Sequence, residues 1–375
     1  MPRLYIHIPY CKQACHYCDF HFSTTMDTRS RLVPALVDEL RLRADELTGT
    51  VDSVYFGGGT PSLLSGEELG LLFSGMDELL TRHPEAEVTL EANPDDLSPD
   101  KLALWKSVGV NRLSIGIQSF HEDDLRWMNR VHTADEALLA VDRARTAGFE
   151  RLTLDLIYGL PHWTAERWEA NLRQLFALEP DHFSAYILTV ESKTALGKRV
   201  AQGKQQVADD SQIEREYALL CALATDAGYR HYEVSNFAKP GKHADHNSAY
   251  WEGEKYVGIG PGAHSFDGRH RRWNIASNTA YLRHMAAGTP FWEGETLTPT
   301  DRHNERLLTG LRTSRGVDLA HFTECGSPAE HPETAAIWRR LVDSGDIVAT
   351  ADGRFRIPES RWLMADGVAG ELFVV

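Results

Sequence analysis

Apolar residues follow two different spacings along the first 230 positions of the chain. Six short runs rich in β-branched and aromatic residues predict strands at 4–8, 53–57, 87–92, 112–118, 151–159 and 182–190. After each run, apolar residues recur at helical spacing, over 29–47, 66–81, 99–107, 134–147, 165–177 and 211–227. Six successive strand–helix units predict an α/β fold with a parallel sheet and crossover helices. This pattern leaves a partial barrel and an open parallel sheet as alternatives, because a closed barrel of this type has eight units.

The pattern changes near residue 230 and again near residue 300. Region 231–299 is crowded with glycine, histidine and aromatic residues and contains HNSAYW at 246–251. From residue 300, helical spacing predicts helices near 302–313, 317–324 and 333–344, followed by a hairpin at 347–358. Helices followed by a hairpin resemble a winged helix. We therefore predict three units: a parallel α/β unit (1–230), a connecting region (231–299) and a C-terminal module (300–375).

Charge and composition narrow the classes of function. The chain has 39 basic and 54 acidic side chains, and residues 300–375 contain nine arginines, no lysine and twelve acids. This balance disfavours a nucleic-acid partner and predicts a packing or lid role for the C-terminal module. No apolar run has the roughly 18 residues of a membrane span, and the N-terminus does not resemble a signal peptide. Five cysteines do not suggest a disulfide framework, so we expect a cytoplasmic protein in which Cys221 and Cys325 are half-buried thiols.

Three cysteines directly follow the first predicted strand. Cys11, Cys15 and Cys18 have the spacing C-x3-C-x2-C in CKQACHYC. A structural zinc ion needs a fourth ligand, and His16 would have to bend back across the same turn to provide it. Three unliganded cysteines are another alternative. Three thiolates alone suit an iron–sulfur cube with one iron left open for a small molecule.

Polar residues also occur at the ends of the following strands. The second strand runs into GGGTPS (57–62), whose glycines let a ligand approach the backbone closely. Glu91, Gln118 and Asp155 lie in or beside the third, fourth and fifth strands, and Arg130 follows the fourth. Each one singly is explained by an internal hydrogen bond or a solvated charge. Because parallel strands end at one edge of a sheet, together they predict a ligand site there.

The motifs CKQACHYC and GGGTPS resemble those of the radical S-adenosylmethionine (SAM) superfamily. Together with YIHIPYC, LEANP, RLSIGIQSF, LDLIYGLP and HNSAYW, they resemble the coproporphyrinogen dehydrogenase (HemN) family over nearly the whole chain, and most of all its shorter, heme-chaperone branch. This resemblance implies a partial (β/α)6 TIM-like barrel of the radical SAM type with a C-terminal helical, winged-helix-like module. It also implies three cofactors: a 4Fe-4S cluster, SAM and heme.

The resemblance assigns roles to individual residues. Cys11, Cys15 and Cys18 would bind the cluster beside Tyr5. The nucleotide pocket would be formed by Gly58, Gly59, Thr60, Glu91, Gln118, Arg130 and Asp155. His246 in HNSAYW would contact heme, although from the residues alone it reads as a buried histidine above an aromatic cluster, and His264 in PGAHSF reads as structural.

Two features separate the branches of this family. Dehydrogenases have a fourth cysteine at the position of Phe20 and an extension before the cluster motif, whereas here ten residues precede Cys11. The resemblance therefore implies a heme chaperone, more a carrier than an enzyme, that delivers heme to acceptors such as respiratory enzymes. Oxygen-independent decarboxylation of coproporphyrinogen III is the main alternative, and radical chemistry on another substrate is a third. The sequence leaves open the acceptor, the oligomeric state and any peripheral membrane contact.

Overall fold

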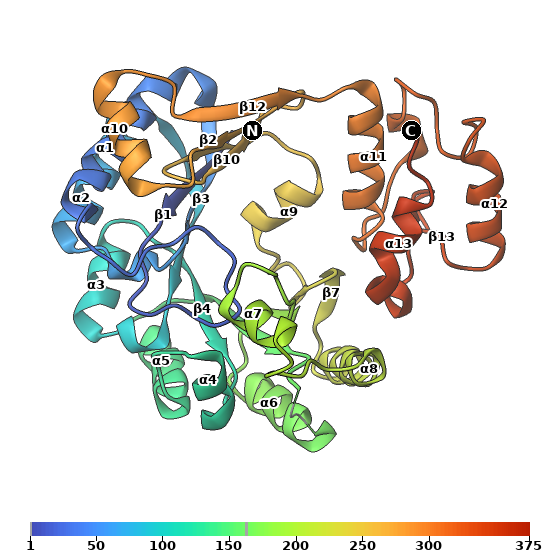
Figure 1. Cartoon of the computed structure of the whole chain (residues 1–375), viewed down its shortest axis with the longest axis horizontal. Coiled ribbons are helices and arrows are strands. Elements are labelled where there is room, and N and C mark those ends of the chain that lie inside the picture. The colour runs from blue at the N-terminus through green and yellow to red at the C-terminus, as the bar shows by residue number, and fades with distance from the viewer. Residues whose placement is uncertain (1, 162–163) are drawn as a thin grey trace.

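The computed structural model describes residues 2–161 and 164–375. Its centre is a nine-stranded sheet with helices packed along its outer side (Figure 1). The first six strands pair in parallel with their neighbours in chain order: β1 (Arg3–Ile8), β2 (Thr50–Gly58), β3 (Thr81–Ala92), β4 (Arg112–Gln118), β5 (Arg151–Tyr158) and β6 (His182–Ile187). All six predicted strands are confirmed, with β6 shorter than expected. The α/β fold with a parallel sheet is as predicted.

The predicted crossover helices are present between the strands. They are α1 (Arg29–Arg43), α2 (Gly66–Leu79), α3 (Pro99–Ser107), α5 (Ala134–Thr146), α6 (Ala165–Ala177) and α8 (Asp210–Asp226). The predicted helix 29–47 ends early, because its last turn is the 3-10 helix η1 (Ala44–Leu47). Helices α4 (Glu122–Met128) and α7 (Ala195–Ala201) were not predicted, since seven residues make only two turns and give little periodicity.

The connecting region extends the sheet at both edges. Strands β7 (Arg230–Glu233) and β8 (Asn236–Ala238) continue it antiparallel beyond β6, and β9 (Val257–Ile259) pairs in parallel with β1. Strands of three or four residues are too short to show alternation in the sequence, which is why the pattern did not predict them. Helix α9 (Asp245–Trp251) lies against β2. A separate antiparallel sheet, β10 (His264–Phe266), β11 (His270–Asn274) and β12 (Trp292–Thr296), and helix α10 (Asn278–Ala287) complete the region.

The C-terminal module departs from the sequence prediction in its second helix. Helices α11 (Pro299–Gly310) and α12 (Ala335–Asp343) form as expected, and the predicted hairpin consists of β13 (Val348–Ala349) and β14 (Phe355–Arg356). The predicted helix 317–324 is wrong, since only the 3-10 turn η4 (Leu319–His321) forms. The reason is that Val317 exchanges backbone hydrogen bonds with Phe355 and is therefore extended. The chain ends with η5 (Glu359–Met364) and α13 (Ala365–Gly370).

A buried carboxylate joins the first helix to the connecting region. Glu39 on α1 is fully buried and accepts hydrogen bonds from the Gly260 backbone N–H, the Asn274 amide and the Tyr281 hydroxyl, at 2.6–2.8 Å. Arg43, one turn later, lies 3.4 Å away and balances its charge. A buried charge that lost these partners would be strongly destabilising. The three hydrogen bonds therefore tie region 231–299 to helix α1, whose buried residues share one hydrophobic core with strands β1 to β6.

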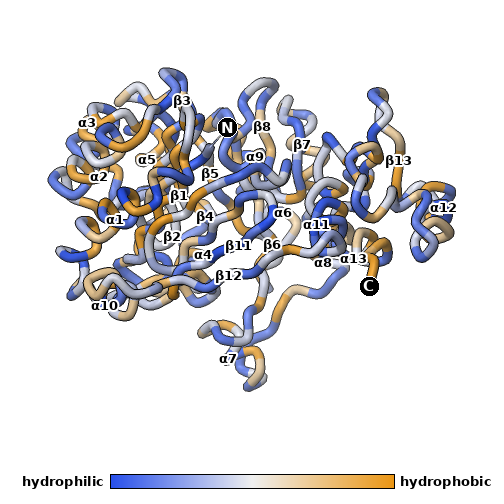
Figure 2. The backbone as a smooth tube through the Cα atoms, turned by 90° about the horizontal axis from the view of Figure 1, so that it is seen from above, coloured by the Kyte–Doolittle hydropathy of each residue, from blue (hydrophilic) through white to orange (hydrophobic). Residues whose placement is uncertain are grey.

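The hydropathy of the chain follows the arrangement of a central sheet surrounded by helices. Apolar segments run along the central strands, and the surrounding helices alternate between apolar and polar segments (Figure 2). Helix α7 stands away from the main body of the molecule in the same view. Within the described ranges, no helix combines the length and apolar character needed to cross a bilayer.

Candidate functional site

The three clustered cysteines lie in a loop that leaves the carboxyl end of β1. The Cys11 N–H donates to the Ser23 carbonyl at 3.0 Å, and the Ser23 N–H donates to the Pro9 carbonyl at 2.8 Å. These bonds close the loop at its base. Cys11, Cys15 and Cys18 are each half-buried within it. The loop therefore presents three thiols at one strand end instead of leaving them on a free segment.

A second set of hydrogen bonds fixes the far side of this loop. The His16 N–H donates to the Met128 carbonyl at 3.1 Å. Asn129, which ends α4 in the left-handed conformation (φ 60°), donates from its side chain to the Ala14 carbonyl at 2.8 Å. The Gln13 amide donates to the Asn129 carbonyl at 3.0 Å. The cysteine loop is thus docked on the end of α4, some 110 residues later in the chain.

Polar groups from other elements face the thiols. Arg130 donates to the Cys15 sulfur at 3.3 Å, and the Thr60 hydroxyl donates to the Cys11 sulfur at 3.5 Å. Burial raises the pKa of the Cys18 thiol to about 11 and also raises that of Cys11. Both shifts favour the protonated form of Cys11 and Cys18 in the metal-free chain, and metal binding would release those protons. The donor set, three sulfurs with a guanidinium nearby, fits an iron–sulfur cluster that carries negative charge.

The glycines after β2 are required by close packing against β1. Gly58 has φ +108°, and a Cβ added there would collide with the His7 imidazole. A Cβ on Gly59 would lie 2.7 Å from the Tyr10 carbonyl oxygen. No larger residue fits at either position without moving backbone or ring atoms. Their N–H groups are already bonded, that of Gly58 to Glu91 at 3.1 Å and that of Gly59 to the Ile8 carbonyl at 2.9 Å, so the glycines fix the loop against β1.

Two half-buried carboxyl groups lie on β3 and β5: Glu91 is next to the last residue of β3, and Asp155 is three residues before the end of β5. Glu91 accepts hydrogen bonds from the Tyr55 hydroxyl at 2.8 Å and from the Gly58 N–H at 3.1 Å. Asp155 accepts from the Ser114 hydroxyl at 3.3 Å. Burial raises the pKa of Glu91 to about 7 and that of Asp155 to about 6. Half-buried carboxyls with raised pKa values near strand ends are typical of a site that binds polar groups of a ligand.

Arg130 connects the cysteine loop to the ends of β3 and β4. It donates to the Asn93 side-chain oxygen at 2.7 Å and to the Gly116 carbonyl at 2.9 Å. Its Nε is buried and has no hydrogen-bond partner among the described residues, so one donor remains for a ligand. Asn93 also donates to the Thr60 hydroxyl at 3.4 Å. The sequence analysis did not single out Asn93, although it lies in LEANP two residues after Glu91, where its side chain falls at the same sheet edge.

The remaining candidates are Gln118, the last residue of β4, and Tyr5, the third residue of β1. Gln118 ends β4 with φ 67°, an uncommon value for a residue with a side chain, and its amide nitrogen lies 2.9 Å from where a Cβ on Gly116 would be. Tyr5 stacks on Tyr55 with ring centroids 6.1 Å apart, and its hydroxyl bonds the His7 Nδ1 at 3.1 Å. The structure thus brings the predicted cluster and nucleotide residues together, while their individual roles stay predictions.

His246 lies on α9 and is separated from Glu91 by Tyr55, which contacts both residues. It is 1% exposed on α9, and its ring stacks on Tyr55, with centroids 5.1 Å apart. Its Nδ1 bonds the Ser53 hydroxyl at 2.8 Å and its Nε2 bonds the Tyr250 hydroxyl at 3.0 Å. Burial lowers the pKa of the ring to about 3, so it is neutral. A heme iron could reach it only by displacing one of these hydroxyls, and the assignment of His246 to heme stays a prediction.

Phe20 takes no part in the packing of the cysteine loop. Its side chain is 72% exposed, although it lies two residues after Cys18. Its backbone N–H is hydrogen-bonded to the Cys18 sulfur, which lowers the pKa of that thiol against the larger effect of burial. The residue therefore contributes to the loop through its backbone and leaves an aromatic ring facing solvent beside the site.

A separate cavity lies at the opposite, amino-terminal end of β1 and β9. Its volume is about 620 Å³, and its lining includes Tyr256, Phe266, His270, Arg272 and Trp292. His270 bonds Asp267 through Nδ1 at 2.8 Å, which leaves its Nε2 free of that bond. The cavity therefore lies at the opposite end of these strands from the cysteine loop. Its His270 offers a second histidine, besides His246, at which heme binding can be tested.

Comparison with known proteins identifies similar sequences over most of the chain. A family model described as the radical SAM superfamily matches residues 5–175. Proteins named heme chaperone HemW are similar: one from Mycobacterium tuberculosis is 36% identical over 98% of this chain and 94% of its own length, and one from Escherichia coli is 40% identical over 85% and 84%. Another, from Bacillus subtilis, is 36% identical over 86% of both chains.

A solved structure has the same fold. It is described as coproporphyrinogen III oxidase (HemN) from Escherichia coli, a radical SAM enzyme. It superposes on all of this chain and 90% of its own with a TM-score of 0.85, at 23% sequence identity. The likeness extends through the connecting region and the C-terminal module as well as the parallel strands.

We expect Glu91→Gln to stabilise the nucleotide-free chain, by at most about 3 kcal/mol and increasingly between pH 4.5 and pH 7. Burial raises the folded-state pKa to about 7, so the unfolded chain releases this proton first and the wild type loses stability as pH rises through that window. Glutamine has no proton to lose. Urea unfolding of both chains across the window measures the difference.

The matched control is Glu85→Gln, an exposed position on the same strand. It should leave the pH dependence of unfolding unchanged. A wild-type chain that gains stability relative to Glu91→Gln as pH rises through the same window would contradict the burial of an uncompensated carboxyl at this site.

Proposed function

Because the chain belongs to the heme chaperone HemW family of the radical SAM superfamily, we propose that it binds a 4Fe-4S cluster, SAM and heme and delivers heme to acceptor proteins such as respiratory enzymes. The observation that carries this proposal is the similarity to proteins named heme chaperone HemW along nearly the full length of both chains. The radical SAM model itself implies the cluster and SAM. Heme, and its transfer to an acceptor, are proposed from the relatives' name.

In this proposal the cysteine loop holds the cluster. Cys11, Cys15 and Cys18 would hold the cluster through their thiolates, and the bound cluster would supply one-electron reduction of the SAM sulfonium. Arg130 offsets negative charge at the Cys15 sulfur, as its contact with that sulfur suggests. The loop's hydrogen bonds to α4 support this role, since they position the thiols before any metal arrives.

The adjoining strand ends hold the nucleotide. The backbone at Gly58 and Gly59, where no side chain fits, receives the methionine end of SAM. Glu91 accepts hydrogen bonds from the ribose hydroxyls, a role that suits a half-buried carboxyl with two neutral donors already in place. The unpaired Nε of Arg130 is available to the SAM carboxylate. Asn93 acts as a positioning residue, since it holds both Arg130 and Thr60.

The chaperone is favoured over the dehydrogenase by the residue beside the cluster. The dehydrogenase branch has a cysteine where this chain has Phe20, whose ring faces solvent. The similarity of this chain to the HemN structure, at 23% sequence identity, concerns the fold alone. Decarboxylation of coproporphyrinogen III is therefore kept as the alternative function, on the same cluster and nucleotide site.

We predict that Cys15→Ala abolishes assembly of the 4Fe-4S cluster, because two thiolates cannot hold three irons of the cube. Iron and sulfide counts after anaerobic reconstitution measure this, with about four of each per chain expected for the wild type. Cys325→Ala, outside the loop, is the control and should reconstitute like the wild type. Equal iron and sulfide in Cys15→Ala would remove this residue from the proposed ligand set.

We predict that His246→Ala weakens hemin binding by at least about tenfold, as expected for loss of an axial ligand. Tyr250→Phe should bind hemin at least as tightly as the wild type, because it removes the hydroxyl that occupies Nε2 and keeps the ring. Soret titrations of both variants measure these affinities. His270→Ala is the control and should bind hemin like the wild type. If only His270→Ala lost hemin affinity, the heme site would be assigned to the cavity at the amino-terminal end of β1.

A further inference from the structure

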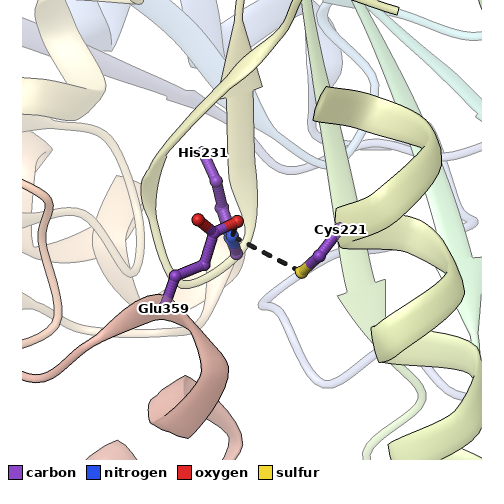
Figure 3. Close-up of side chains that lie close together, drawn as sticks. All are labelled: Cys221, His231 and Glu359. Carbon is purple, nitrogen blue, oxygen red and sulfur yellow. Dashed lines mark hydrogen bonds and ion pairs between the residues drawn. The ribbon is translucent and has the colours of Figure 1, made fainter. Parts of the chain in front are cut away.

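Three side chains that suit a metal ion meet where the barrel contacts the C-terminal module. Cys221 lies on α8, His231 on β7 and Glu359 at the start of η5, and their side chains point toward one another (Figure 3). The Cys221 sulfur, the His231 Nδ1 and a Glu359 oxygen all lie within 4.8 Å of one another. Neither the cluster site nor the nucleotide site uses these residues, so their convergence needs its own explanation.

The hydrogen bonds of His231 turn a ligand nitrogen toward the other two side chains. Its Nε2 lies 3.1 Å from the Val234 carbonyl, which can only accept, so Nε2 carries a hydrogen. Its Nδ1 lies 2.9 Å from a Glu359 oxygen and 3.9 Å from the Cys221 sulfur. In a neutral ring this Nδ1 is a lone pair that faces a carboxylate. A metal ion bound between these groups would use this lone pair together with the carboxylate and the sulfur.

The distances are close to those of a tetrahedral zinc site. With zinc bonds of about 2.3 Å to sulfur and about 2.0–2.1 Å to nitrogen and oxygen, the sulfur and nitrogen would be about 3.6 Å apart and the nitrogen and oxygen about 3.4 Å apart. The observed separations of 3.9 and 2.9 Å differ from these by 0.3–0.5 Å in opposite directions. The third separation, between the Cys221 sulfur and the Glu359 oxygen, is within 4.8 Å, and about 3.6 Å is expected for a tetrahedral zinc site.

The imidazole is held rigidly in the orientation that this site needs. Its ring stacks on Phe237 with centroids 3.8 Å apart, and the edge of Trp362 packs against it at 4.3 Å. Glu359 is fixed through its backbone, because its carbonyl accepts the Tyr217 hydroxyl at 2.8 Å. The His231 side chain is 1% exposed, whereas that of Glu359 is 38% exposed. A metal ion here would therefore have buried ligands on one side and water on the other.

We propose that Cys221, His231 and Glu359 bind a zinc ion, with water as the fourth ligand, and that this ion ties the C-terminal module to α8 and β7. One thiolate and one carboxylate neutralise Zn²⁺, and a mixed sulfur, nitrogen and oxygen donor set is suited to this metal. Binding releases the Cys221 thiol proton to solvent, because the thiolate is the form that ligates zinc. This site is independent of the heme proposal and remains if that proposal fails.

The test is cobalt binding to the full-length chain carrying Cys11→Ala, Cys15→Ala and Cys18→Ala, which removes the competing thiols of the cluster loop. Co²⁺ bound by a thiolate gives a sulfur-to-metal charge-transfer absorption in the near ultraviolet. We expect this band at one cobalt per chain and its displacement by zinc. Cys221→Ser should abolish it, and Glu359→Gln should weaken cobalt binding at least about tenfold. Cys325→Ser, at a lone cysteine elsewhere, should leave it unchanged.

A second measurement uses the chain with its cluster cysteines intact and the cluster reconstituted. After exposure to zinc and desalting, the wild type should retain one more zinc per chain than Cys221→Ser, by elemental analysis. Equal zinc content, or a cobalt band that survives Cys221→Ser, would overturn the proposal. The three residues would then be an ion pair of His231 and Glu359 beside an unliganded thiol.

Discussion

Parallel pairing of six consecutive strands is the constraint on which the rest of this structure depends. Because β1 to β6 pair in chain order, all their carboxyl ends meet at one edge. Ile8 lies beside Gly58 at the ends of β1 and β2, so the segment that carries the cysteines and the glycine loop leave the sheet side by side. The helices and the two flanking additions to the sheet hold this edge in place, and the candidate site is a consequence of its geometry.

Two acids and one arginine give this edge its electrostatic character. Glu91 and Asp155 are half-buried with raised pKa values, and the Arg130 Nε is buried without a partner among the described residues. A carboxylate in partly buried surroundings and an unpaired buried N–H each cost folding free energy. Groups of complementary charge and hydrogen bonding, such as the hydroxyls and the carboxylate of SAM, would offset that cost. Perturbed pKa values of this kind are common at functional sites.

The six parallel strands and the crossover helices could be predicted because the strands have at least six residues and the helices at least nine, enough for burial to impose a visible period. The added strands β7, β8 and β9 could not be predicted, since three or four residues carry no usable period. The predicted helix at 317–324 failed because Val317 pairs with Phe355 of β14, far along the chain. Site residues at strand ends were found from position and motif. Asn93 was missed because its role depends on contacts with Arg130 and Thr60, and the surroundings of His246 depend on α9 packing against β2.

The most direct test of the central claim, a radical SAM protein that handles heme without making it, is product analysis under anaerobic conditions. The reconstituted chain is incubated with reductant, SAM and coproporphyrinogen III, with the Escherichia coli coproporphyrinogen III oxidase as positive control. The account predicts that coproporphyrinogen III is recovered unchanged by a preparation that binds hemin. Catalytic formation of protoporphyrinogen IX would contradict it and would make this chain a dehydrogenase despite Phe20.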